Sequence, residues 1–241
     1  LLHLYAYLGV GLALPHQLWT GQNFLDSPVA TAYWWTLWVA AAGAVLVFRV
    51  ALPAYRSAVR GLRVESVTRE TDDVVSVTLR GRRLDRLDPL PGQFFNWRFL
   101  SGPGWTRAHP YSLSAAPTGE RMRITVKDLG DGSRALADVK PGTRVLIEGP
   151  YGRLHPGVRT QRKVTLMASG IGISPMRSLL EGLPQGPGDV TLLYRARSEA
   201  DLVLSPELDE LSLRTGARVV YLPGRRLAGR DTWLPEVAAG F

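Results

Sequence analysis

The stretch Val164–Met176, VTLMASGIGISPM, decides the fold class of the C-terminal half of this chain. An apolar run, Val164–Ala168, leads into the glycine-rich turn SGIGISPM, Ser169–Met176, and a helical pattern runs from Ser174 to about Leu183. A strand, a glycine-rich turn and a helix start in this order present backbone amides to a dinucleotide phosphate. The turn departs from the G-x-G-x-x-G pattern, so it predicts a nucleotide site only weakly by itself.

Further strands and a helix follow this unit and extend the same pattern. They are the strand Val190–Tyr194, the helix Ser205–Thr215 and the strand Arg218–Leu222. Strands that alternate with helices predict a parallel, doubly wound α/β sheet. Three strands make one half of such a sheet, so we expect this domain to be C-terminally incomplete.

The motif YRAR, Tyr194–Arg197, stands at the end of the second of these strands. Ligands of open α/β sheets gather at the carboxyl ends of the strands. Arg195 and Arg197 are therefore candidates for pairing with an adenosine 2′-phosphate. Ordinary surface arginines are the alternative.

Residues before this half, from about Leu62, show short segments in which apolar and polar residues alternate. Such strands, separated by Gly- and Pro-rich turns, predict a small antiparallel barrel or sandwich. The candidate strands are Leu62–Val67, Val74–Arg80, Gln93–Phe99, Tyr111–Ser114, Arg121–Lys127 and Arg144–Glu148. Three motifs fall among them: HPYSLSAAP (His109–Pro117), GDGS (Gly130–Ser133) and EGPYG (Glu148–Gly152). Each is unspecific alone, although the glycines and hydroxyl of GDGS suit a phosphate or pyrophosphate.

The N-terminal part contains the stretches Leu1–Trp19 and Val29–Phe48, which carry no Lys, Arg, Asp or Glu. Each is long enough to span a bilayer, so we expect two transmembrane helices. Arg49, Arg56, Arg60 and Arg63 follow the second stretch, and basic residues flank the cytoplasmic end of a membrane helix. The pattern predicts a cell-membrane protein, multi-pass, whose remaining domains are cytoplasmic.

His3 and His16 lie in the first apolar stretch. An ionisable side chain in hydrocarbon is costly, and neutral imidazole is a common ligand of transition metals. Along a helix the two positions are roughly 20 Å apart, which suits two metal centres, one near each leaflet. Polar contacts between packed membrane helices are the alternative.

The composition excludes several classes of function. The formal net charge is +8, and every Lys and Arg follows residue 48. An anionic membrane surface explains this excess, whereas the scattered arginines do not form the stripe that nucleic-acid binding needs. The absence of cysteine excludes disulfides, thiol catalysis and Cys-ligated clusters in this chain.

Taken together, the order HPYSLSAAP, GDGS, EGPYG, SGIGISP, YRAR resembles the ferredoxin–NADP reductase type of flavin dehydrogenase. With the two apolar stretches and their histidines, the whole chain resembles the ferric reductase and NADPH oxidase family. The resemblance implies a multi-domain membrane protein. Its parts would be a transmembrane helix pair over 1–60, an antiparallel FAD-binding β-barrel over 61–158 and a truncated NAD(P)-binding α/β domain over 159–241. Two partner histidines and a C-terminal Cys-Gly-Pro motif of that family are absent, so we expect a fragment.

The resemblance also implies roles for individual residues. Tyr111 would pack near the isoalloxazine of FAD, and the Ser112 hydroxyl would lie near its reactive nitrogen as the catalytic group. The other FAD-binding residues would be His109, Pro110, Lys127, Gly130, Gly132 and Ser133. The nicotinamide nucleotide, with NADPH favoured, would bind Gly170, Gly172, Ser174, Pro175, Arg195 and Arg197. Two b-type haems would take His3 and His16 as iron ligands.

The implied activity is electron transfer across a membrane. Cytoplasmic NAD(P)H would reduce FAD, and the electrons would pass through two haems to a small extracytoplasmic acceptor such as ferric iron or dioxygen. Membrane lipid would be a further partner, and nucleic acid would not. One alternative is a membrane-anchored, haem-free flavin reductase that feeds a cytoplasmic partner. Another is a non-catalytic, nucleotide-binding membrane subunit.

Overall fold

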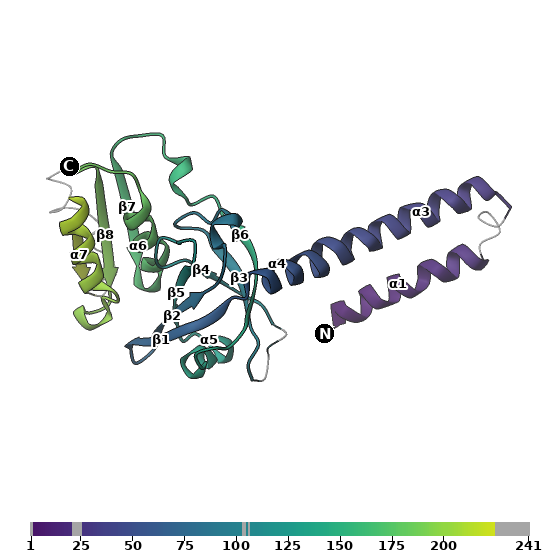
Figure 1. Ribbon diagram of the computed structural model, residues 1–241, viewed down its shortest axis with the longest axis horizontal. Helices are drawn as coiled ribbons and strands as arrows, with labels where there is room; N and C mark the ends of the chain where they lie inside the picture. The colour runs from purple at the N-terminus through teal and green to yellow at the C-terminus, as the bar shows by residue number, and fades with distance from the viewer. Residues whose placement is uncertain (1, 21–25, 103–104, 106, 225–241) are drawn as a thin grey trace, which may run out of the picture. The chain divides into compact units, whose positions relative to one another are not determined.

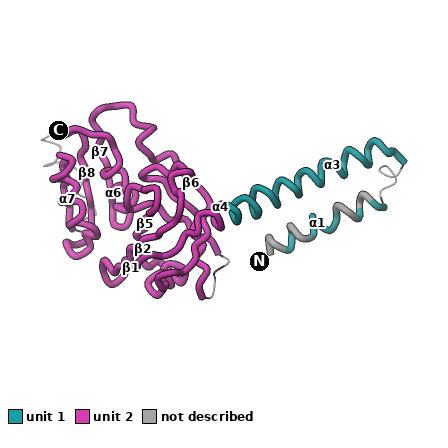
Figure 2. The backbone as a smooth tube through the Cα atoms, viewed as in Figure 1, with its two compact units in different colours: residues 1–55 teal, residues 56–241 magenta. Residues whose placement is uncertain are grey.

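The computed structural model describes residues 2–20, 26–102, 105 and 107–224 (Figure 1). The chain divides into two compact units, Leu1–Tyr55 and Arg56–Phe241 (Figure 2).

The first unit consists of α1, Leu2–Thr20, and a long helix that continues into the second unit. The long helix is built from α3 (Pro28–Val45), a π-helical segment (Leu46–Ala51) and α4 (Leu52–Arg60). Ser27 caps its start by accepting a hydrogen bond from the Ala30 amide at 3.3 Å. Proline at position 53 has no N–H for the carbonyl of Arg49, and its ring clashes with that carbonyl in a regular helix. The wider π-helical turn just before Pro53 accommodates this clash.

The expected pair of transmembrane helices is wrong. Among the described residues, one helix, Pro28–Arg60, is long and apolar enough to cross a membrane by length and composition. The predicted fold class of two transmembrane helices followed by a flavin barrel and a nucleotide domain therefore fails in its membrane part. The physical reason is that an uncharged stretch is not necessarily an apolar one. His3, His16 and Gln17 lower the hydropathy of α1 although the helix carries no charge.

The second unit begins with six antiparallel strands in two sheets of three. One sheet has the order β1-β2-β5 and the other β4-β3-β6. Single bridges between Leu113 and Ile124 and between Arg63 and Arg144 join the sheet edges and close a barrel. The strands are β1 (Arg63–Thr71), β2 (Val74–Arg80), β3 (Phe94–Phe99), β4 (His109–Ser112), β5 (Arg121–Lys127) and β6 (Val145–Tyr151).

Strand β5 shows how the alternation of the sequence becomes the two faces of the barrel wall. Met122, Ile124 and Val126 are buried in the barrel core, and the residues between them point to the other face. That second face carries Arg123, Thr125 and Lys127, and Arg123 and the main chain of Thr125 contact the helices of the α/β part.

The α/β part has a parallel sheet of order β7-β8-β9 with a hydrophobic core of its own. Its strands are β7 (Val164–Ser169), β8 (Val190–Ala196) and β9 (Arg218–Pro223), and its helices are α6 (Ile173–Gly182) and α7 (Ser205–Thr215). Short helical turns lie at Leu84–Leu87, Asp131–Arg134 (α5), Ala135–Asp138, Pro156–Val158, Gly170–Gly172 and Glu199–Asp201. All nine described strands begin within two residues of their predicted starts.

Helix α6 is fixed to the barrel by polar side chains at positions i, i+4 and i+7. Ser174 Oγ donates to the Thr125 carbonyl at 3.0 Å, Ser178 Oγ donates to the Ala115 carbonyl at 2.9 Å, and Glu181 accepts from the Ala116 amide at 2.6 Å. These spacings place all three side chains on one helix face. At the end of the helix, a Cβ added to Gly182 would lie 2.2 Å from Pro91 Cγ, so this contact requires glycine.

A cluster of ionised side chains continues the same interface. Arg123 of β5 donates two hydrogen bonds to Glu207 of α7, at 2.7 and 2.8 Å. Arg177 of α6 forms an ion pair with Glu207 at 2.8 Å and a second one with Glu181. The side chains of Arg123 and Arg177 are 17% and 10% exposed. Burial of this kind strengthens the Coulomb attraction within the pairs and makes the loss of one partner costly.

Candidate functional site

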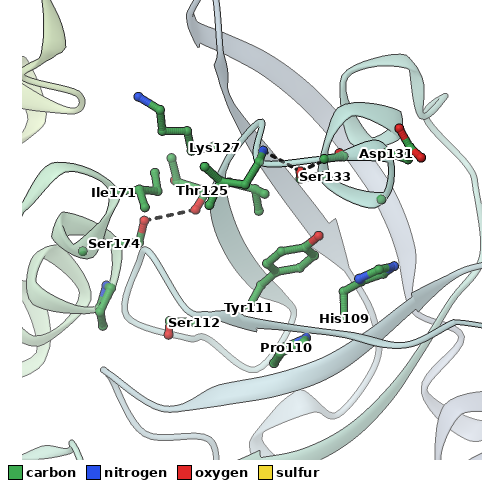
Figure 3. Close-up of a pocket in the computed structure, with 16 residues that line it drawn as sticks. His109, Pro110, Tyr111, Ser112, Thr125, Lys127, Asp131, Ser133, Ile171 and Ser174 are labelled. Atoms are coloured by element: carbon green, nitrogen blue, oxygen red, sulfur yellow. Dashed lines mark hydrogen bonds between the residues drawn. The ribbon is translucent and has the colours of Figure 1, made fainter.

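A cavity of about 530 Å³ opens where β4, β5 and α5 meet the start of α6 (Figure 3). Its wall on the barrel side comes from two neighbouring strands and the loop after β5. Its opposite wall comes from the glycine-rich turn between β7 and α6. The lining residues are His109, Pro110, Tyr111, Ser112, Thr125, Val126, Lys127, Leu129, Gly130, Asp131, Gly132, Ser133, Ile171, Gly172, Ser174 and Pro175.

A second cavity of about 760 Å³ adjoins the first. Lys127, Leu129 and Ile171 line both, so the two cavities share one rim. The other lining residues of the second cavity are Thr71, Asp73, Val74, Ser169, Gly170, Arg195, Ala196, Arg197, Asp201, Val203 and Gly224.

The structure brings together every residue that the sequence predicts to bind FAD or the nicotinamide nucleotide. Those in the first cavity are His109, Pro110, Tyr111, Ser112, Lys127, Gly130, Gly132, Ser133, Gly172, Ser174 and Pro175. Gly170, Arg195 and Arg197 lie in the second cavity. Their individual roles stay predictions.

The predicted haem ligands lie in the other unit. His3 belongs to α1, but its side chain is outside the described part of the structure, and His16 is exposed. No group of three or more His, Cys, Asp or Glu side chains that could hold a metal ion occurs among the described residues.

Strand β4 supplies a wall of stacked rings. The rings of His109 and Tyr111 lie nearly parallel, 19° apart, with their centroids separated by 6.1 Å, and both project from β4 in Figure 3. Trp97 Nε1, in the barrel core, donates to the Tyr111 carbonyl at 2.9 Å and so fixes the main chain of this strand. Burial raises the pKa of the Tyr111 phenol, which keeps it neutral and able to donate a hydrogen bond.

The loop Gly130–Ser133 is closed by its own serine. Ser133 Oγ donates to the Gly130 carbonyl and accepts from the Leu129 amide, both at 2.8 Å. A Cβ added to Gly132 would lie 2.5 Å from the His109 ring, so a larger residue here would displace that ring. The amides of Asp131 and Gly132 have no acceptor within the described residues. Free amides beside a stacked aromatic wall fit the pyrophosphate and ring system of FAD.

Replacing Ser133 by alanine should weaken FAD binding about tenfold, because two hydrogen bonds that fix the loop are lost. Fluorescence titration of the FAD-free protein measures the dissociation constant. Ser66→Ala, at an exposed position on β1, is the control and should leave it unchanged. An unaltered constant in Ser133→Ala would show that the loop does not hold the cofactor.

Sequence reasoning missed several lining residues of the two cavities. Thr125 could have been found, because it lies two residues before Lys127 and shares its face of β5. Asp73 could not, since it reaches the site from the turn between β1 and β2. Its carboxylate lies 2.8 Å from Lys127 Nζ, and this hydrogen bond holds the pKa of Asp73 below its ordinary value. The pair fixes Lys127 on the rim that the two cavities share.

In the second cavity, basic and acidic side chains lie together at the end of β8. Arg195 Nη2 donates to the Gly224 carbonyl at 3.4 Å, and Arg197 is exposed. Asp201, which accepts from Ser198 Oγ at 2.8 Å, lines the same cavity. Guanidinium groups can pair with a phosphate, and a carboxylate can accept from ribose hydroxyls. The charges therefore suit the adenosine end of a nicotinamide dinucleotide.

Comparison with known proteins agrees with this geometry. Residues 166–233 match the family described as oxidoreductase NAD-binding domain. The chain is 34% identical over 171 residues to the ferredoxin reductase component of 3-ketosteroid-9-alpha-monooxygenase from Mycolicibacterium smegmatis, covering 67% of this chain and 48% of that protein. It is 38% identical over 133 residues to the ferredoxin–NAD(+) reductase component of the alkene monooxygenase system of Xanthobacter autotrophicus, covering 54% and 40%.

A solved structure gives the same result for the fold. The FAD/NAD-binding domain of nitric oxide dioxygenase from Vibrio cholerae superposes with a TM-score of 0.59 at 25% identity, covering 73% of this chain and 82% of that one. The second unit therefore contains a ferredoxin reductase-type FAD/NAD-binding oxidoreductase domain. The chain spans about half the length, or less, of the two curated relatives named above. These comparisons do not support the more specific resemblance to ferric reductases and NADPH oxidases.

Proposed function

We propose that this chain is an NAD(P)H-dependent flavin reductase module that passes electrons to a separate acceptor protein. The observation that carries the proposal is the rim that the two cavities share at Lys127, Leu129 and Ile171. FAD in the first cavity and a nicotinamide nucleotide in the second can meet across this rim. The two relatives named above are reductase components of oxygenase systems, which supports a protein partner as the acceptor.

The protein's contribution to this chemistry is binding, orientation and hydrogen bonding. Bound FAD would supply the ability to accept a hydride and to release electrons one at a time. Ser112, half-buried in the first cavity, would offer its hydroxyl to the reacting edge of a flavin bound there. Tyr111 presents a neutral phenol and a flat apolar face. None of these side chains needs to act as a nucleophile or a general base.

The proposal is tested on the purified full chain supplied with FAD. We expect a flavin absorption spectrum and oxidation of NAD(P)H coupled to reduction of a one-electron acceptor such as ferricyanide. Ser112→Ala should slow flavin reduction more than it weakens FAD binding. A folded protein that takes up no FAD would contradict the proposal, and FAD binding without turnover would favour the non-catalytic, nucleotide-binding alternative.

NADPH is the nucleotide that we expect this site to prefer. Replacing Arg195 and Arg197 together by alanine should raise the KM for NADPH about 10- to 100-fold, because charge-assisted contacts to the 2′-phosphate are lost. The KM for NADH should barely change. Arg153→Ala/Lys163→Ala removes the same charge elsewhere and is the control. Equal use of NADH and NADPH by the unmodified protein would show that the preference is wrong.

The membrane-anchored, haem-free form of this function is better supported than the two-haem relay. Among the described residues, one helix, Pro28–Arg60, is long and apolar enough to cross a membrane by length and composition. A protein with one such anchor, and with its acceptor on the same side as the flavin, needs no electron path across the bilayer. We propose that this side is the cytoplasm, on the strength of Arg56 and Arg60. Haem absorption in the purified protein that disappears in His3→Leu or His16→Leu would instead restore the relay.

A further inference from the structure

The end of the barrel remote from the two cavities carries a hollow of about 740 Å³ surrounded by arginines. Arg63, Arg80, Arg82 and Arg83 line it, together with Glu65 and Glu120. Arg121 and Lys127 mark the two ends of β5. Six residues of strand separate the ends by roughly 20 Å, so the hollow is distinct from the flavin and nucleotide sites.

The arginines around this hollow face one another across strands. Arg63 lies directly opposite Arg80, Arg80 opposite Arg121, and Arg63 is bridged to Arg144. Like charges in opposite positions of a sheet destabilise it. Arg83 adds a backbone cost, because its φ of 52° lies in the left-handed region that non-glycine residues rarely adopt. Repulsion between like charges and a strained backbone that occur at one place are typical of a site that binds a ligand of opposite charge.

The two carboxylates of the hollow neutralise only part of this charge. Glu65 is engaged by Arg121 through two hydrogen bonds of 2.8 Å, and Glu120 lies 3.5 Å from Arg80. Among the described residues, no acid forms an ion pair with Arg63, Arg82 or Arg83. All three are exposed. Arg63 Nη1 donates to the Gly142 carbonyl at 2.9 Å, and the other N–H groups of the three guanidinium groups have no acceptor among the described residues.

We propose that this hollow binds a phosphate group, with Arg63, Arg82 and Arg83 as donors. Planar guanidinium groups suit the oxygens of a phosphate, which they can contact in pairs. The phosphate can belong to a soluble phosphorylated molecule or to a lipid headgroup. The chain itself leads to this region from the helix Pro28–Arg60, since Arg63 follows that helix by three residues.

The test uses the full chain with FAD in phosphatidylcholine nanodiscs. Because the chain has no cysteine, Pro141→Cys, next to Gly142 of the hollow, gives a unique site for a fluorescent label. The soluble probe is tripolyphosphate, compared with chloride at equal ionic strength. The lipid probe is phosphatidylglycerol added to the nanodisc. We expect a saturable change in label fluorescence with at least one probe.

Charge variants decide whether the arginines are responsible. Arg82→Glu/Arg83→Glu should weaken the response at least tenfold, and Arg63→Gln, placed on a different element, should weaken it as well. Arg153→Glu/Lys163→Glu carries the same charge change elsewhere and should respond normally. The flavin spectrum reports that each variant is folded. Response to tripolyphosphate identifies a soluble ligand, and response to phosphatidylglycerol alone identifies a headgroup. No saturable response, or equal weakening in the control, overturns the proposal.

Discussion

Replacing Trp97 by alanine is expected to lower the free energy of unfolding by about 3–5 kcal/mol and to weaken FAD binding. Trp97 is completely buried in the barrel core, where its ring lies 5.5 Å from that of Phe95. Alanine would leave a large cavity and would remove the hydrogen bond from the indole to the Tyr111 carbonyl. Chemical denaturation measures the first effect, and titration with FAD measures the second.

Two variants separate packing from hydrogen bonding at this position. Trp97→Phe keeps most of the ring but loses the N–H, so it should cost about 1 kcal/mol and loosen β4. Trp105→Ala removes a tryptophan that is 54% exposed, and it should change stability by less than about 0.5 kcal/mol. If Trp97→Ala unfolds at the same denaturant concentration as the unmodified protein, the core is not organised around this ring.

Replacing Glu207 by alanine is expected to cost on the order of 2–3 kcal/mol. Arg123 and Arg177, both largely buried, would each lose a carboxylate partner. The loss should also slow flavin reduction, because the cluster joins α6 and α7 to β5 beside the glycine-rich turn. Glu210→Ala, at an exposed position on the same helix, is the control. Equal unfolding curves for the two variants would show that the cluster contributes nothing.

The same carboxylate predicts a dependence of stability on pH. Burial raises the pKa of Glu207, but its hydrogen bonds and charge interactions with Arg123 and Arg177 outweigh burial and hold the pKa below its ordinary value. A lowered pKa in the folded state stabilises the protein above the unfolded value of about 4.3. This stabilisation is lost as the pH falls through the lower, folded value. Glu207→Gln should flatten that part of the stability profile, and an unchanged profile would contradict the assignment.

The strands could be predicted because they depend on local patterns, and many of the lining residues of both cavities could be predicted from the resemblance that the order of motifs carries. Alternation along β5 places Lys127 on the outer face, and VTLMASGIGISPM places a turn after a buried strand. The arrangement of charges could not be predicted in this way. Asp73 lies far from Lys127 in the sequence, and Arg123 lies far from Glu207, so only the closed barrel and its docked helices bring each pair together.

The wrong membrane assignment has a different origin. The absence of charged residues does not make a helix apolar enough to span a membrane, and α1, which has no charge, contains His3, His16 and Gln17. Both α1 and the stretch Val29–Phe48 lack charged residues, but only the helix Pro28–Arg60, which contains the second stretch, is apolar enough among the described residues. Transfer free energy depends on every polar group of a helix, not on ionised ones alone.

The side chains of Ser174, Ser178 and Glu181 on one face of α6 limit which parts of related reductases can be joined in a chimeric protein. A chimera that joins this barrel to the nucleotide part of another reductase would place a foreign helix against the Thr125 and Ala115 carbonyls and the Ala116 amide. Unless that helix offers the same donors and acceptor at the same spacing, these three main-chain groups would lose their hydrogen-bond partners where the barrel meets the helix. The proposed preference for NADPH is therefore better altered at the end of β8, where Arg195 and Arg197 can vary without disturbing the contacts of α6 with the barrel. A chimeric reductase built from this protein should therefore keep the barrel and α6 together as one transferred segment.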